Sequence, residues 1–400
     1  MSGALFDVVV AGGGPVGWAC ALAAQTALSR GGHRPRIAVI ERDPLTVIAA
    51  ADPISARVYT VASGNLDWLN EHGVNIDVAR SAAVTDIQVF GRDGADSLCV
   101  AANDAGRSEL ARVIEHDALT LSIALAAQKA GVSLISGECI ALYGESGART
   151  VELADRNLLQ SRMVVAADGA NSRLRDAAGL EVSRHAYPQH GVVANLRCTK
   201  AHRDSARQWF LPDGSILALL PLPGLDASAA VSMVWSVPVE RARFLCALPE
   251  AALMAEINAA SGDVAGVCAV LNGTRSFPLN LLRVVNPVAE RFLAVGDAAH
   301  AMHPLAGQGV NVGLADARCL FDVWQHAVDV HGDPGHALLL SRYRRERYGP
   351  TLAMQLATDG LFRLYNQQDH PFLMAAGDAG MRLLGRLPVF RRTLSTNALQ

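Results

Sequence analysis

The 400-residue sequence has little lysine, few charges and no closely paired cysteines. Lys129 and Lys200 are the only lysines, and 35 basic against 38 acidic groups leave a net charge of -3. Binding to nucleic-acid phosphates needs a basic face, so this balance argues against a nucleic acid as partner. The seven cysteines are odd in number and far apart, which argues against a disulfide framework or a cysteine-based zinc site.

A membrane-spanning run is also missing. A spanning helix needs roughly 20 mostly apolar residues, but the longest uncharged stretch, Val8–Ser29, is interrupted by glycines and a proline. No basic segment precedes it, so it is not typical of a signal peptide. We therefore expect a soluble, cytoplasmic chain.

The predicted elements begin with a strand at Asp7–Ala11, a glycine-rich turn, a helix from about Val16 to Arg30 and a strand at Arg36–Glu41. A strand–helix–strand opening is typical of a parallel sheet. The opening strand–helix–strand unit of the chain therefore predicts an α/β fold.

Later segments alternate between an α/β pattern and a β-rich pattern. Residues 60–72 and 109–130 are predicted as helices, and 84–100 as strands. From about 185 to 240 the pattern is that of an antiparallel sheet, and the apolar strand Arg291–Val295 then returns to the α/β pattern. A nucleotide-binding domain interrupted by a β-sheet domain explains this order better than two independent halves.

The glycine-rich turn has the spacing GxGxxG. Gly12 permits a tight turn, Gly14 lets the backbone approach a pyrophosphate, and Gly17 lets the helix pack closely on the strand. The helix then offers its first N–H groups to phosphates. Glu41, at the end of the next strand, is placed to accept hydrogen bonds from an adenosine ribose. The pattern predicts a dinucleotide but does not distinguish FAD from NAD.

A second motif favours FAD. The strand Arg291–Val295 runs into Gly296 and Asp297, and a helix opens near Gly309. The glycine gives a tight turn, and the aspartate can accept a hydrogen bond from a ribityl hydroxyl. The helix N-terminus would face the flavin edge that becomes negative on reduction.

A third motif follows the predicted strand Met163–Ala167. Asp168 and Gly169 end this strand, and Ser172 and Arg175 follow. Taken alone, this pattern is equally compatible with a strand end, a turn and a helix cap.

Together the three motifs resemble the FAD-dependent aromatic hydroxylases of the 4-hydroxybenzoate hydroxylase type. Within that class the chain is more similar to the ubiquinone-biosynthesis hydroxylases, over roughly residues 1–365. The similar stretches are Ala56–Ser63, Trp209–Leu222, Val234–Ser236, Ser276–Leu279, Gly296–Asp316, Tyr343 with Arg347, and Thr358–Leu361. Tyr59 departs from the pattern, because the family usually has a small residue there, and the last 30 residues match poorly.

The motifs and the resemblance together predict a set of FAD-binding residues, in which the resemblance places Arg57 near the flavin. The predicted set is Gly12, Gly14, Pro15, Val16, Gly17, Glu41, Arg42, Arg57, Asp168, Gly296, Asp297, Gly307, Gly309, Val310 and Asn311. Pro304 is predicted to shape the reactive side of the flavin, and no acid or base is assigned. No metal is expected, since only Asp297 could complete a site with His300 and His303.

The resemblance implies a monooxygenase that hydroxylates a polyprenylated phenol or quinol, a hydrophobic intermediate of ubiquinone biosynthesis. FAD, reduced by NAD(P)H or another donor, would react with O2 to give a C4a-hydroperoxide, and the electron-rich ring of the substrate would attack its distal oxygen. Two alternatives stay open: a hydroxylase of a small soluble aromatic compound, and a flavin-binding scaffold of a biosynthetic complex without turnover.

The resemblance also implies a Rossmann-like FAD-binding domain with an inserted substrate domain. The predicted division is 1–72, 100–177 and 284–340 for FAD, 73–99 and 178–283 for substrate, and 341–400 for a C-terminal helical region. The last region carries nine arginines and four acidic residues. Two interpretations of it stand: a peripheral contact with an anionic membrane or a partner complex, or an ordinary helix that covers the FAD-binding domain.

Overall fold

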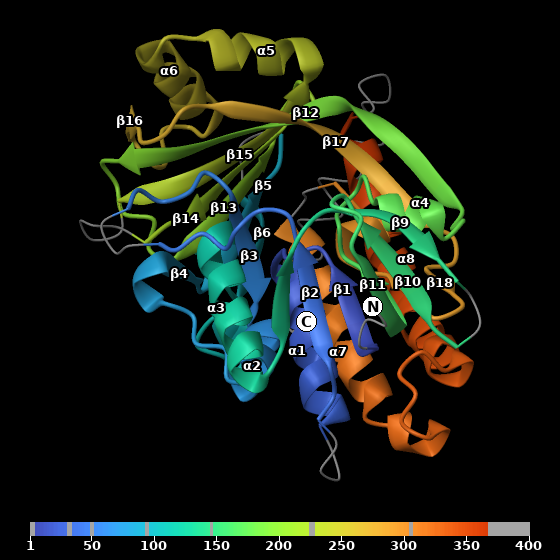
Figure 1. The fold of residues 1–400 in the computed structure, drawn as a ribbon. Helices are drawn as coiled ribbons and strands as arrows, with labels where there is room; N and C mark the ends of the chain where they lie inside the picture. The colour runs from blue at the N-terminus through green and yellow to red at the C-terminus, as the bar shows by residue number, and fades with distance from the viewer. Residues whose placement is uncertain are drawn as a thin grey trace.

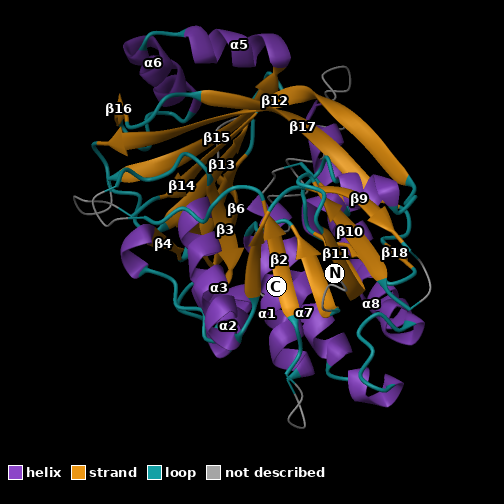
Figure 2. Cartoon of the chain, in the orientation of Figure 1, coloured by secondary structure: helices purple, strands orange, loops and turns teal. Residues whose placement is uncertain are grey.

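The computed structural model describes residues 5–29, 34–48, 52–92, 96–144, 147–223, 229–303 and 307–366. Pro304 and the part of the basic C-terminal region beyond residue 366 lie outside the described residues. The described chain forms two large sheets, one above the other, with helices on their outer faces (Figure 1). Strands and helices alternate in the lower layer, whereas strands dominate the upper one (Figure 2).

The bounds of the strands are as follows. They are β1 Phe6–Ala11, β2 Ile37–Glu41, β3 Val58–Ala62, β4 Ser81–Val84, β5 Asp86–Phe90, β6 Asp96–Ala101, β7 Ala111–Glu115, β8 Ser133–Ser136, β9 Cys139–Tyr143, β10 Arg149–Leu153, β11 Leu158–Ala166, β12 Val182–Cys198, β13 Ser205–Phe210, β14 Ile216–Pro221, β15 Ala230–Pro238, β16 Val267–Val270, β17 Arg275–Val284, β18 Val288–Ala289, β19 Phe292–Ala294 and β20 His300–Ala301.

The α-helices are α1 Pro15–Leu28, α2 Ser63–Glu71, α3 His116–Ala130, α4 Arg173–Ala177, α5 Val239–Ala247, α6 Glu250–Ala260, α7 Gly309–Trp324 and α8 Ala337–Asn366. Among the described residues, no helix is both long enough and apolar enough to cross a bilayer.

The lower sheet has the strand order β18-β19-β11-β1-β2-β8, and β1 pairs in parallel with both β2 and β11. Val8, Val9 and Val10 are completely buried, because a central parallel strand is covered on both faces. On one face pack α1, α3 and α7. The βαβ opening predicted from the sequence is therefore present, with α1 beginning at Pro15 and ending at Leu28.

The upper sheet has the order β20-β17-β12-β15-β14-β13-β5-β6, with β16 beside β12. Its pairs are antiparallel except for β5 with β13, which is parallel. Helices α5 and α6 cover one face through Ala242, Leu245, Leu253 and Ile257. The opposite face looks toward the lower sheet and toward the end of α8 (Figure 1).

Two predicted helices begin as strands. Residues 58–62 and 111–115 form β3 and β7, which pair with each other, and β4 adds to β7. The helices α2 and α3 start only after these strands. The β-branched residues Val113 and Ile114 are buried in this three-stranded sheet, so pairing with neighbouring strands overrides the helical pattern.

The predicted segment 73–99 divides between two sheets. β4 pairs with β7 in the three-stranded sheet, whereas β5 and β6 join the upper sheet. β20, which follows the Gly296–Asp297 motif, also joins the upper sheet by pairing with β17. The upper sheet therefore contains strands from residues 86–101 and 300–301 in addition to those from 182–284.

Candidate functional site

Three turns lie together because the strands that carry them are neighbours. β1, β11 and β19 are adjacent and parallel, and they end at Ala11, Ala166 and Ala294. The predicted motifs follow directly at 12–17, 168–170 and 296–298. The carboxyl ends of adjacent parallel strands form the ligand-binding edge of such sheets, so all three motifs face one place.

The first turn has the geometry that its glycines suggest. Gly12 has a φ of +103°, and a Cβ there would lie 2.4 Å from the carbonyl oxygen of Ala167. A Cβ on Gly17 would lie 1.9 Å from the carbonyl oxygen of Gly12. A Cβ on Gly14 would meet no heavy atom of the protein within 4 Å. Gly12 and Gly17 are thus required by packing, whereas Gly14 leaves space for a group from outside the protein.

Glu41 reaches this turn from the end of β2. Its carboxylate accepts hydrogen bonds from the Gly13 N–H at 2.5 Å, from the Arg42 N–H at 2.8 Å and from the Asp43 N–H at 3.0 Å. The side chain of Arg42 is exposed and paired with Asp43 at 3.1 Å. The structure therefore brings Glu41, but not the Arg42 guanidinium, to the turn.

Pro15 and Val16 begin α1 and join it to the second motif. Pro15 is the first residue of the helix, where its missing N–H costs nothing. A Cβ on Gly296 would lie 3.2 Å from Val16, and one on Gly313 would lie 2.5 Å from it. Val16 therefore packs directly between the second turn and α7, which fixes two of the motifs against each other.

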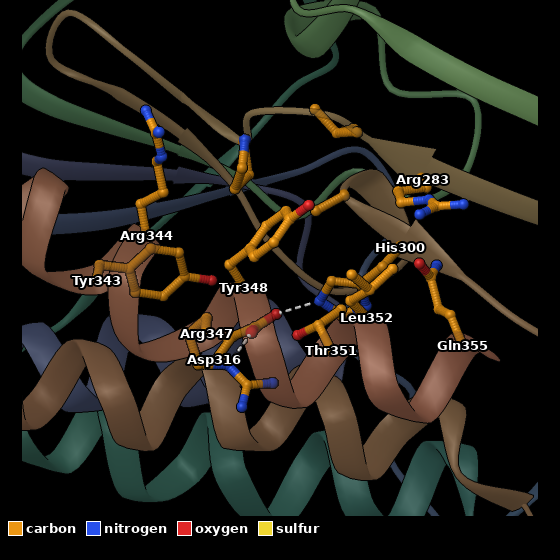
Figure 3. A pocket seen from close by; sticks show the side chains of 13 residues that line it. Arg283, His300, Asp316, Tyr343, Arg344, Arg347, Tyr348, Thr351, Leu352 and Gln355 are labelled. Atoms are coloured by element: carbon orange, nitrogen blue, oxygen red, sulfur yellow. Dashed lines mark hydrogen bonds and ion pairs between the residues drawn. The ribbon is translucent and has the colours of Figure 1, made fainter. Parts of the chain in front are cut away.

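The second turn is anchored from behind by a buried carboxylate. Asp316 of α7 is completely buried; it accepts from the Gly296 N–H at 3.0 Å, pairs with the His300 ring at 2.6 Å and accepts from Arg347 of α8 at 2.7 Å. Figure 3 shows these side chains on one side of a pocket between α8 and β17. Burial would raise the pKa of the Asp316 carboxyl, but its two partners and the Gly296 N–H hold that pKa well below its usual range.

Asp297 itself is not part of this anchor. It is exposed, and its carboxylate makes no hydrogen bond with the rest of the described chain. The aspartate is therefore presented at the ligand-binding edge by a turn whose other side is fixed. Asp316 and Arg347 have no predicted role in the sequence, although an acidic residue within the apolar run Val310–Ala317 is a signal for a buried partner.

The third turn is tied to the second by one guanidinium. Arg175 is completely buried and donates from Nη1 to the carbonyl oxygens of Ala170 at 3.0 Å and Ala298 at 3.1 Å. Burial raises the pKa of the Asp168 carboxyl, and hydrogen bonds from Ser172 and backbone groups offset part of this rise. Oδ1 of Asp168 is buried without a hydrogen-bond partner in the described structure. It is therefore available to accept from a ligand.

The predicted residues at the start of α7 differ in whether their backbone amides or their side chains are free to bind a ligand. The first amides of the helix, at Gly309, Val310 and Asn311, precede the first helical bond, which the Val312 N–H makes to Gln308. The Asn311 side chain is fully used: it accepts from the Ala62 N–H at 2.8 Å and donates to the Thr60 carbonyl at 2.8 Å.

The side chain of Asn311 thus links α7 to β3. Its backbone N–H group is one of the first amides of the helix. Gly307 also lies against β3, because a Cβ there would be 3.2 Å from Thr60. β3 therefore sets where the start of α7 lies.

Arg57 lies at the start of β3, beside Tyr59 and His116. The guanidinium lies 5.4 Å from the centre of the Tyr59 ring, and the Tyr59 hydroxyl contacts Nδ1 of His116 at 3.1 Å. Burial raises the pKa of Tyr59 to about 12, and the nearby Asp297 charge adds to this rise. The structure therefore brings Arg57 to the same region as Asp297, together with Tyr59 and His116.

The donor and acceptor groups that have no partner among the described residues fit FAD. The space at Gly14 and the start of α1 suit a pyrophosphate, Asp297 suits a ribityl hydroxyl, and the N-terminal amides of α7 suit the electron-rich edge of a flavin. These groups converge from three strands on one edge of the sheet.

The comparisons with known proteins agree with this cofactor. Residues 6–356 match the FAD binding domain family. The chain is similar to ubiquinone hydroxylase UbiL of Rhodospirillum rubrum, with 30% identity over 98% of this chain and 89% of that protein. It is likewise 30% identical to 3-demethoxyubiquinol 3-hydroxylase of Escherichia coli, over 94% of this chain and 95% of that protein.

A solved structure shares the fold. The crystal structure of p-nitrophenol 4-monooxygenase PnpA from Pseudomonas putida has a TM-score of 0.77 with this chain, at 19% identity, over 98% of this chain and 97% of that one. At this identity the likeness concerns the fold alone. It agrees with the predicted α/β architecture of an FAD-binding domain with an added β-sheet.

Proposed function

The chain belongs to the FAD binding domain family as an FAD-dependent monooxygenase, and we propose that it hydroxylates the ring of a polyprenylated phenol or quinol intermediate of ubiquinone biosynthesis. Two relatives that match nearly its whole length are a ubiquinone hydroxylase and a 3-demethoxyubiquinol 3-hydroxylase. Their names support this substrate class.

One observation carries the proposal: three turns with complementary chemistry meet at the ends of β1, β11 and β19. The turn at Gly14 leaves room for a pyrophosphate, Oδ1 of Asp168 is buried without a partner, and Asp297 is exposed with no hydrogen-bond partner among the described residues. A purely structural role would pair the buried Asp168 oxygen with a protein group, since buried polar groups in folded proteins are almost always hydrogen-bonded.

FAD, when bound and reduced, supplies the activation of O2. We propose NAD(P)H as the electron donor and O2 as the co-substrate. The chain's own part is to hold the pyrophosphate on the amides of α1, the ribityl group on Asp297 and the flavin edge on the first amides of α7. Arg57 lies in this region as a cation, and its charge would attract the phosphates or the flavin edge.

The apolar face of the upper sheet is evidence for an apolar aromatic substrate. Its face toward α8 forms a buried cluster with that helix, in which the sheet contributes Val89, Tyr187, Phe210, Ile216 and Leu279 and α8 contributes Phe362 and Tyr365. A ring between this cluster and the ligand-binding edge of the lower sheet would be shielded from water. Exclusion of water protects reactive intermediates from side reactions.

A test of the proposal combines genetics with product analysis. In a strain from which the gene is deleted, mass spectrometry should find a prenylated phenol or quinol that lacks one hydroxyl group, and the intact gene should restore the normal profile. Purified FAD-loaded protein should convert that compound to the hydroxylated product with NAD(P)H and O2.

A normal quinone profile in the deletion strain, together with turnover of a small polar phenol, would instead favour the soluble-substrate alternative. Purified protein that holds FAD but consumes no reductant with any phenol would favour the scaffold alternative.

We also propose a peripheral contact of a cytoplasmic enzyme with a membrane or a partner complex through the C-terminal region. In support, the described part of α8 exposes Leu338, Leu356 and Leu361, and the same helix exposes Arg344 and Arg345. Co-sedimentation with anionic vesicles, but not with neutral ones, would support the membrane contact, and loss of binding on changing both arginines to serine would assign it to this helix.

A further inference from the structure

His303 is completely buried between the two layers of the molecule. Its ring stacks on Phe362 of α8, with ring centres 5.0 Å apart, and meets the edge of Tyr187 of β12 at 5.2 Å. Both neighbours belong to the apolar cluster on the face of the upper sheet. The imidazole is thus the polar group at the centre of an aromatic environment.

Neither ring nitrogen of His303 has a hydrogen-bond partner in the described structure. The nearby charged group is Asp359, but its carboxylate is already bonded to the Tyr187 hydroxyl at 3.1 Å and to Arg363 at 2.8 Å. The ring of His185 also contacts Tyr187, with ring centres 5.8 Å apart. No charged side chain of the described elements packed around His303 therefore takes up its donor or its acceptor.

A ring without polar atoms would fill this position without the cost of two unpaired nitrogens, since each buried unpaired polar group destabilises a fold. Burial also lowers the pKa of His303 to about 4, which the Asp359 charge only partly opposes. The imidazole is therefore neutral near pH 7, with one nitrogen free to accept a hydrogen bond and the other free to donate one.

The position of His303 relative to the cofactor region is fixed by its neighbours in the chain. His300, three residues before it, is held by Asp316, and Ala301 pairs with Leu282 of β17. Asp297, the predicted ribityl contact, lies six residues before it. The imidazole is thus held on the side of this segment that faces the apolar cluster.

We infer that His303 is the polar contact that recognises the ring hydroxyl of the substrate, by accepting a hydrogen bond from the phenolic O–H. This inference rests on the proposed function. Since the imidazole has no exposed surface in this structure, one of its two ring neighbours must turn away on binding, and the substrate ring then fills the same apolar volume. A hydrogen bond from the phenol also leaves the aromatic ring more electron-rich, which favours attack on an electrophilic oxygen.

The test compares two ligands on three forms of the FAD-loaded enzyme. The ligands are an ortho-prenylated phenol and prenylbenzene, which lacks the hydroxyl. The forms are the wild type, His303→Phe, which keeps a ring but removes both nitrogens, and His185→Phe. The last is a matched control, because His185 contacts the same tyrosine but is exposed. Binding is followed by the change in the visible flavin spectrum, and product formation is measured separately.

The wild type and His185→Phe should prefer the phenol by about tenfold or more, as expected for one hydrogen bond to a buried acceptor. His303→Phe should bind both ligands alike, with unchanged FAD content and a melting temperature no lower than that of the wild type. If phenylalanine does not fit, His303→Leu provides the same comparison with a smaller side chain.

A His303 variant that keeps the full preference for the phenol, while the wild type hydroxylates it, would refute the role of His303 and leave the proposed function intact. A wild type that neither binds nor hydroxylates the phenol would overturn the proposed function, and the inference with it.

Discussion

The two sides of the segment from Gly296 to His303 are built in opposite ways. Toward α7 and α8, three hydrogen bonds converge on Asp316 from Gly296, His300 and Arg347. Toward the upper sheet and the strand ends, Asp297 and His303 have no hydrogen-bond partner among the described residues. The first side holds the turn in place, and the second presents polar groups to something other than the protein.

This difference separates residues that stabilise the fold from residues that bind ligands. A buried polar group with protein partners should affect the free energy of unfolding when it is removed. A polar group without partners should affect binding, and its removal should leave the fold intact or more stable. Four substitutions test this distinction.

The largest effect is expected for Asp316→Ala. Removing the carboxylate leaves the largely buried side chain of Arg347 without its charged partner, and breaking a buried ion pair typically costs about 3–5 kcal/mol. Urea unfolding should show this loss. Asp43→Ala, which removes the exposed partner of Arg42, should leave the unfolding midpoint unchanged. Asp316→Leu combined with Arg347→Met should recover most of the stability, and failure to do so would show that the pair has a role beyond charge balance.

His303→Phe should change how stability depends on pH. The pKa of His303 in the native protein, about 4, lies below the ordinary value of 6.5. Between these two pH values the imidazole is protonated in the unfolded chain but neutral in the native one. The wild type therefore loses stability as the pH falls from about 6.5 to 4, by up to about 3 kcal/mol from this residue.

Urea unfolding of both proteins across this pH range isolates the contribution of His303, because the other titrating groups are shared. The variant should be at least as stable as the wild type at pH 7 and should lose less on acidification. Parallel curves for the two proteins would show that the imidazole is not held neutral.

Asp297→Ala should weaken FAD binding without destabilising the protein. A hydrogen bond to a charged group contributes about 1.5–3 kcal/mol, so the Kd for FAD should rise roughly 10- to 100-fold. Flavin fluorescence titration of the apoprotein measures this change, and Asp297→Asn, which keeps an acceptor, should show a smaller one. Stoichiometric FAD with unchanged affinity in the alanine variant would remove Asp297 from the site.

The smallest effect is expected for Gly14→Ala. No protein atom lies within 4 Å of the added methyl group, so the unfolding midpoint should stay the same while FAD affinity falls roughly tenfold through contact with the pyrophosphate. Gly17→Ala is the matched contrast, because its methyl group would overlap the Gly12 carbonyl oxygen, and it should destabilise the protein itself. Equal FAD affinity for Gly14→Ala and the wild type would place the pyrophosphate elsewhere.

Much of the cofactor region could be predicted from the sequence, because its requirements are local. Gly12, Gly17 and Gly296 have the backbone geometry or the close contacts that their turns demand. The strands β1, β2 and β11 are close to their predicted positions because a buried parallel strand has a continuous apolar pattern. Predictions failed where pairing partners decide the structure, as in β3 and β7, which were expected to be helical.

The present contacts of two predicted cofactor-binding side chains could not be predicted from the sequence. The amide group of Asn311 links α7 to β3, and the Arg42 guanidinium is exposed beside Asp43. The cofactor contacts of both residues stay predictions. A motif indicates which residues come near a site, whereas the direction of each side chain depends on the partners around it.

The sequence by itself determined the fold class, the three turns and the FAD that they suit, because glycine conformation and strand hydrophobicity are properties of short segments. Only the tertiary structure decided which polar groups are paired and which are left for a ligand. Asp316 finds Arg347 through the contact of α7 with α8, and His303 lacks partners because β12 and α8 surround it with aromatic rings. Hydrogen bonding and burial in the interior depend on residues far apart in the chain, and no local pattern contains them.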